Sequence, residues 1–169
     1  FIDLSSSIPH PDNSFDLVIC LEGLKHIPNV QKALSEMKRV TKPGGKIILT
    51  IPNDLCLQAR FRYFFDGFSD VDWKHPMVVG DANDQSFIYL GSQLSLPYLW
   101  FFLQKQGLRV LSTTHDRLRT YSVLLMILFY PFIVIQTYRA SKKDARLFRE
   151  LVSFTWLAGR HNLVVCEKN

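Results

Sequence analysis

The sequence is short of cysteine and lacks the spacings that would place cysteines in a zinc site or a disulfide framework. Its three cysteines are an odd count among 169 residues, with no CxxC pair. Cys20 and Cys166 lie inside apolar, strand-like runs, which favours buried thiols in a reducing compartment. The first residues show no signal-peptide pattern and no initial methionine. We therefore expect that an N-terminal portion of the parent protein precedes Phe1.

The sequence also lacks an apolar run of the roughly 20 residues that a membrane-spanning helix needs. Its most apolar segment, residues 123–135, is shorter, and Pro131 interrupts it. This segment is interpreted either as a helix that covers the core or the substrate, or as a helix in a membrane interface, while its length disfavours a membrane span. The basic residues on its two sides are Arg117, Arg119, Arg139, Lys142, Lys143, Arg146 and Arg149.

Composition and charge indicate one folded domain. Hydrophobic residues make up 47% of the chain and charged residues 21%, which argues against disorder. The net charge of +5 is modest, and the excess lies late in the chain. This distribution favours a local anionic partner and argues against a protein that coats nucleic acid.

Hydrophobic periodicity predicts an α/β fold. A strand over residues 16–21, a helix over 28–42 and a strand over 46–51 form a strand–helix–strand unit, which implies parallel strands and a right-handed crossover. Asn29 is the expected N-cap of that helix, and Pro43-Gly44-Gly45 is expected to end it. The further elements expected are helices over 55–65 and 96–106, the second capped by Ser95, and strands over 108–113 and 162–167.

Polar residues gather just after the first predicted strand. Glu22, Lys25 and His26 follow its apolar run, at the carboxyl end where open α/β sheets bind ligands. Asp16 enters the same strand at the opposite end, so we expect a structural role for it. Glu22 and His26 are therefore candidate site residues on position alone.

The first third of the chain resembles a known family. The matching segments are Asp3 and residues 8–9, 11–18, 24–27, 34–45 and 48–53. Together they are similar to the class I S-adenosylmethionine-dependent methyltransferases of the broad type 11 kind. The resemblance implies a Rossmann-like sheet of seven strands, the last one antiparallel. This chain would supply the second half of that sheet, with a helical insertion before the last strand.

The resemblance also implies a division of the chain. The expected parts are a cofactor-side core (1–53), an acceptor-side insertion (54–95), a helix and strand (96–116), an apolar and basic helical insertion (117–160) and the last strand (161–169). The family's glycine-rich cofactor loop has no counterpart here, because no GxGxG occurs and Pro43-Gly44-Gly45 precedes a strand. This departure favours truncation.

The resemblance implies four cofactor-binding residues. Asp3 matches the acid that accepts a hydrogen bond from the adenine amino group, with the Leu4 backbone beside it. Cys20 and Leu21 would line the methionine part of S-adenosylmethionine. The alternatives are a turn acid for Asp3 and ordinary strand core for Cys20 and Leu21.

The similar ubiquinone-pathway O-methyltransferases carry two glutamates and a histidine after this strand, which can hold a divalent cation. Lys25 stands at the second glutamate position, so we expect no metal here. His26 is predicted to act as a general base together with Glu22, or else to cap the next helix. His75 is a second candidate for acceptor contact.

The sequence thus predicts an enzyme that transfers a methyl group from S-adenosylmethionine to a small-molecule or lipid-linked acceptor. The alternative is a non-catalytic, methyltransferase-like binding or scaffold module without the cofactor loop. We expect no nucleic-acid partner. The expected location is cytoplasmic, with peripheral attachment to an anionic membrane's inner face as the further possibility that residues 123–135 raise.

Overall fold

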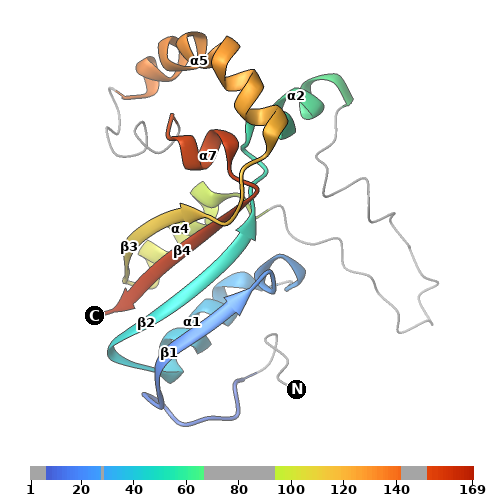
Figure 1. The fold of residues 1–169 in the computed structure, drawn as a ribbon. Coiled ribbons are helices and arrows are strands. Elements are labelled where there is room, and N and C mark those ends of the chain that lie inside the picture. Colours follow the sequence, from blue (N-terminus) through green and yellow to red (C-terminus); the bar gives the residue numbers. More distant parts are fainter. Residues whose placement is uncertain (1–6, 28, 67–93, 142–151) are drawn as a thin grey trace, which may run out of the picture.

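The computed structural model describes residues 7–27, 29–66, 94–141 and 152–169, and these contain one four-stranded sheet (Figure 1). Its strands are β1 (Phe15–Leu21), β2 (Thr41–Pro52), β3 (Leu108–His115) and β4 (His161–Lys168), in the order β1-β2-β4-β3. β1 pairs with β2 in parallel, whereas β4 lies antiparallel between β2 and β3. The predicted α/β class and the antiparallel last strand are both confirmed.

The helices lie in two places. α1 (Val30–Val40) and α4 (Leu96–Lys105) pack behind the sheet, whereas α2 (Leu57–Asp66), α5 (Thr120–Ser141) and α7 (Phe154–Ala158) lie beyond the ends of β2 and β3 (Figure 1). A short 3₁₀ helix, η1 (Leu24–His26), follows β1. The carboxyl ends of β1 and β2 therefore open towards the cluster of α2, α5 and α7.

The core forms where α1 packs on β2 and α4 packs on β3. Val30, Leu34 and Met37 recur at helical spacing and are buried against Ile47 and Leu49, which alternate along β2. The predicted N-cap is confirmed, because the Asn29 side chain accepts a hydrogen bond from the Lys32 amide at 3.0 Å.

The end of α1 differs from the prediction of residue 42. The helix ends at Val40, because Thr41 already pairs with Phe15 across the sheet. The register then shifts before Leu17 pairs with Lys46. Gly44 has a φ of +75°, and a Cβ on Gly45 would lie 2.7 Å from Thr41 Cγ2. The two glycines therefore form the bend that leads into the regular part of β2.

The two ends of α4 differ in how they are capped. Gly107 has a φ of +68°, as expected for the residue after a helix. Leu94 and Leu99 are both buried around the first turn of α4. Ser95 occupies the N-cap position, but its side chain makes no capping hydrogen bond, so that detail was wrong. Pro97 in the first turn lacks an amide proton, which leaves one fewer donor for a cap to satisfy.

The predicted cysteine state is confirmed. Cys20, Cys56 and Cys166 are free and buried. Burial raises the pKa of the Cys20 thiol and raises that of Cys166 to about 12, because a low-polarity environment disfavours the thiolate.

The apolar segment 123–135 lies inside α5, a helix longer than the segment itself. One side of this helix packs on α2, where Phe129 meets Phe61, whereas Leu124, Ile127, Leu128 and Phe132 are exposed. Among the described residues, no helix is both long enough and apolar enough to cross a membrane.

An ion-pair cluster ties the start of the described chain to α1. Arg39 donates to Asp12 Oδ1 at 2.8 Å and to both oxygens of Glu36, and Glu36 Oε2 also accepts from the Ile8 amide at 3.0 Å. The hydrogen bonds from Arg39, followed by that from Ile8, lower the pKa of Glu36 to about 2.

The lowered pKa of Glu36 predicts that the fold loses stability in acid. A carboxyl group whose folded-state pKa lies below its ordinary value of 4.5 stabilises the fold above that value, and this stability is lost as pH falls towards about 2. Urea unfolding between pH 6 and pH 3 should therefore show a smaller acid loss for Glu36→Gln than for the unsubstituted chain. Glu167→Gln, which alters a surface pair with Arg109, is the matched control and should retain the acid loss. Equal slopes for both variants would contradict the assignment.

Candidate functional site

The exit of β1 is built around Glu22. Its φ of +57° is unusual for a residue with a side chain, and its amide donates to Thr50 Oγ1 at 2.9 Å. Such backbone conformations persist where the surrounding structure holds them, and they concentrate at functional sites. Thr50, in the neighbouring strand β2, is the residue that holds this turn.

The Glu22 carboxylate has one engaged oxygen and one that is unengaged within the described chain. Oε2 lies 3.3 Å from Lys25 Nζ. Oε1 is shielded from solvent and has no hydrogen-bond partner among the described residues. A buried acceptor without a donor is costly, so Oε1 is suited to receive a donor from a bound molecule.

The other residues predicted at this exit lie on η1 and at the end of β1. His26 ends η1 with an exposed side chain, and Lys25 pairs with Glu22. Cys20 is buried against the α1 side of the sheet, while the Leu21 side chain is 63% exposed on the other side. The structure thus brings Glu22, Lys25 and His26 together in one short segment. It places Cys20 and Leu21 on opposite faces of the sheet.

The exit of β2 is held by a buried amide. Asn53 is 1% exposed, and its Nδ2 donates to the carbonyls of Trp156 and Gly159, both at 2.9 Å, and of Thr155 at 3.3 Å. Its Oδ1 accepts from the Leu55 amide at 3.1 Å. Asn53 therefore joins the end of β2 to α7 and fixes the direction in which the chain continues towards α2.

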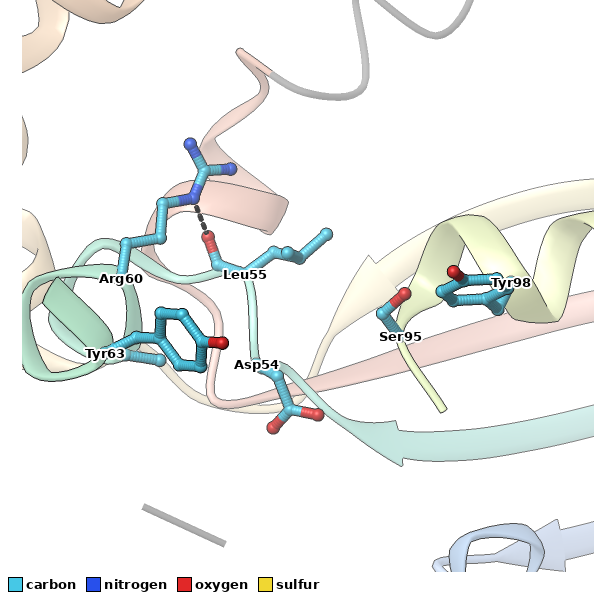
Figure 2. A pocket seen from close by; sticks show the side chains of 7 residues that line it. Asp54, Leu55, Arg60, Tyr63, Ser95 and Tyr98 are labelled. Atoms are coloured by element: carbon cyan, nitrogen blue, oxygen red, sulfur yellow. Dashed lines mark hydrogen bonds between the residues drawn. The ribbon is translucent and has the colours of Figure 1, made fainter. Parts of the chain in front are cut away.

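A pocket of about 360 Å³ opens directly after Asn53. It is lined by Asp54, Leu55, Ala59, Arg60, Tyr63, Ser95 and Tyr98. Figure 2 shows Tyr63 on one side, Ser95 and Tyr98 on the other, and Asp54 between them. Since β1 and β2 are parallel neighbours, this pocket and Glu22 lie at the same edge of the sheet.

Arg60 supports the pocket wall. Its Nε donates to the Leu55 carbonyl at 2.6 Å (Figure 2). Burial lowers the pKa of the Arg60 guanidinium, because low polarity disfavours its charge. Sequence reasoning did not single out these lining residues, because they come from α2, α4 and the strand exit. The signal that could have found them is the Pro52-Asn53-Asp54 exit, which parallels the exit at Glu22.

A second polar pair lies where β3 leads towards α5. Asp116 Oδ2 is 2.7 Å from His161 Nδ1, and Asp116 Oδ1 accepts from the His161 and Arg117 amides. His161 in turn pairs with Pro52 across β2 and β4. The pair therefore anchors the start of β4 beside the β2 exit, a structural role that the sequence did not indicate.

Three candidate residues lie outside the described residues. They are Asp3, Leu4 and His75. Their predicted roles in cofactor and acceptor contact stay predictions.

Known sequences match the part of the chain that contains the exit of β1. Residues 2–49 match the family model described as a methyltransferase domain. Over 92 residues, which are 54% of this chain, the sequence is 35% identical to the ubiquinone/menaquinone biosynthesis C-methyltransferase UbiE of Cupriavidus taiwanensis. The match spans 37% of that relative's length.

Comparison with solved structures extends the likeness across the chain. An S-adenosylmethionine-dependent methyltransferase of Archaeoglobus fulgidus superposes with a TM-score of 0.52 at 12% identity, covering 94% of this chain and 61% of that one. One from Mesorhizobium loti gives 0.51 at 10% identity, covering 99% and 67%. The resemblance in sequence to class I methyltransferases is confirmed, and so is the Rossmann-like methyltransferase fold.

Proposed function

We propose that this chain forms part of an S-adenosylmethionine-dependent methyltransferase acting on a small-molecule or lipid-linked acceptor. The observation that carries the proposal is the strained exit of β1, where Glu22 keeps a shielded carboxylate oxygen without a partner in the described chain. The methyltransferase-domain match includes this exit and β2 up to Leu49. The proposal thus rests on a local site and on a family likeness that cover the same residues.

The residues at this exit suit the cofactor. S-adenosylmethionine supplies an electrophilic methyl group on a sulfonium. Its amino group is a hydrogen-bond donor that Glu22 Oε1 could accept, and the exposed Leu21 side chain offers apolar contact. Asp3 and Leu4 complete the proposed set at the adenine, as the resemblance implies.

The catalytic proposal assigns proton transfer to His26. A hydroxyl or carbon acid must lose a proton to become electron-rich, and a histidine titrates near neutral pH. The exposed imidazole on η1 can accept that proton. Lys25 neutralises part of the Glu22 charge through their 3.3 Å contact.

The acceptor is proposed to enter the pocket after β2. Tyr63 and Tyr98 present aromatic rings, and Asp54 and Ser95 present hydrogen-bonding oxygens (Figure 2). Such a mixture suits a compact acceptor with an apolar body and a few polar groups. The lipid-linked alternative is supported by the exposed apolar side chains of α5 and the basic residues around it in the sequence.

Calorimetric titration of the full-length protein with S-adenosylmethionine tests the proposal. We expect saturable binding, together with transfer of label from methyl-labelled cofactor to a lipid or small-molecule extract. A folded protein that binds no cofactor would instead support the non-catalytic binding or scaffold module.

A further prediction concerns the proposed base. His26→Asn should lower kcat/KM for methyl transfer by about 100-fold, because general acid–base catalysis typically contributes that much. Affinity for S-adenosylmethionine, measured by calorimetry, should change by less than about threefold, since the histidine is assigned to the acceptor's proton and not to the cofactor.

His10→Asn is the matched control, because His10 stacks edge-on with Phe15 at the opposite end of β1. It should leave the rate of methyl transfer unchanged. Equal losses of rate in the two variants would remove His26 from the mechanism.

A further inference from the structure

The exposed side of α5 is apolar along its length. Its exposed side chains recur every three or four positions, which places them on one face of the helix. The opposite side packs towards the protein, where Phe129 contacts Phe61 of α2 at 4.9 Å and Ser122 accepts from the Gln58 amide. We call the exposed side the α5 outer face: Tyr121, Leu124, Ile127, Leu128, Phe132 and Ile135.

The end of α2, which packs against α5, carries further exposed aromatic side chains. Phe61 packs on Phe129 of α5 and also stacks on Phe65 with ring centres 6.4 Å apart. Phe65 in turn meets Phe64 edge-on, and the Phe64 side chain is 81% exposed. A chain of ring contacts therefore joins α5 to an exposed aromatic pair on α2.

Water is a poor solvent for such a surface. Ile127 and Leu128 are 75% and 72% exposed, so burying them in an apolar phase is favourable. A helix that is apolar on its packed side and also on its outer side is typical of one that meets a second apolar phase. Contiguous exposed apolar patches of this kind mark interaction surfaces.

The charges beside the face favour lipid as that phase. Between residues 116 and 149 the sequence has seven basic residues (Arg117, Arg119, Arg139, Lys142, Lys143, Arg146, Arg149) against two acidic ones (Asp116, Asp144). Tyrosines stand near both ends of α5, at positions 121 and 138. Anionic headgroups attract basic residues, and aromatic rings suit the headgroup boundary.

We propose that the α5 outer face, with Phe64 and Phe65 of α2, docks onto the surface of an anionic lipid bilayer. The helix lies in the plane of the interface, with its apolar side chains among the upper acyl chains and Arg117 at the headgroups. α2 also supplies Tyr63 to the wall of the pocket that follows β2. The docked orientation therefore brings that pocket beside the bilayer, which, on the proposed function, favours an amphiphilic acceptor drawn from the membrane.

Vesicle co-sedimentation without cofactor or acceptor tests the docking independently of methyl transfer. The full-length protein is mixed with vesicles of phosphatidylcholine alone or with 30% phosphatidylglycerol. We expect binding to the anionic vesicles, weakened by salt and weakened about tenfold or more in the double variant Ile127→Ser/Leu128→Ser. Arg117→Glu should weaken binding to the anionic vesicles but not to the neutral ones.

Leu111→Ser is the matched control, because Leu111 is an exposed apolar residue on β3, away from α5. It should bind as the unsubstituted protein does, and circular dichroism should show that each variant is folded. Failure of the unsubstituted protein to sediment with anionic vesicles, or unchanged binding of the double variant, overturns the proposal. A dimer in solution that the double variant dissociates also overturns it, since the face would then join two copies of the chain.

Discussion

Replacing Asn53 with alanine lowers the free energy of unfolding by about 3 kcal/mol or more, because each buried polar group left without a partner costs about 1–3 kcal/mol. The carbonyls of Trp156 and Gly159 lose their donor, and the Leu55 amide loses its acceptor. All three contacts lie at the junction of β2, α7 and the pocket. The loss is therefore expected in stability and in the geometry of the site together.

Asn29→Ala is the control for Asn53→Ala. Its side chain is exposed and accepts one hydrogen bond, from the Lys32 amide, so its removal should cost about 1 kcal/mol, as is usual for a helix N-cap. Urea unfolding followed by circular dichroism measures both. Similar decreases in the free energy of unfolding for the two variants would show that the Asn53 contacts do not stabilise the junction of β2 and α7.

Replacing Trp156 with alanine is expected to cost about 3–5 kcal/mol, the usual range for removing a large buried aromatic side chain. Trp156 is fully buried, and its ring meets that of Trp100 edge-on, with centres 6.1 Å apart and planes at 83°. Trp100 belongs to α4, so this contact joins the end of the chain to the main core behind the sheet. The cavity left by alanine would separate α7 from that core.

Phe154→Ala in the same helix is the control for Trp156→Ala. Phe154 is 42% exposed and meets His115 at the rim, so its loss should cost less than half as much. Thermal unfolding of the two variants, followed by near-ultraviolet circular dichroism, compares them. A cost for Trp156→Ala no larger than that of Phe154→Ala would place the tryptophan outside the core.

The side chains of Asn53 and Trp156 explain why α7 matters to the site, although the sequence did not indicate it. α7 has five residues, too few to be predicted from periodicity. Its position depends on the side-chain amide of Asn53, which donates to the Trp156 carbonyl, and on the Trp156 indole, which packs against Trp100. In each contact the two residues lie about 50 to 100 positions apart in the chain. Contacts between distant residues leave no local pattern for a sequence argument to detect.

The sequence by itself determined the alternation of strands and helices, because burial on one face imposes a period of two on strands and 3.6 on helices. It also placed Glu22 and His26 at a carboxyl edge, since parallel strands joined by a crossover end on the same side. The family resemblance added the antiparallel last strand, which β4 confirms.

The tertiary structure alone decided three things. It seats Glu22 at a positive φ with one carboxylate oxygen shielded, which depends on Thr50 in the neighbouring strand. It assembles the pocket from the β2 exit, α2 and α4, segments separated by about 40 residues. It turns the most apolar part of the chain, α5, outward. Hydrophobicity predicts that a segment is buried away from water. Only the packing shows whether it is buried within the protein itself or is left exposed for another apolar phase.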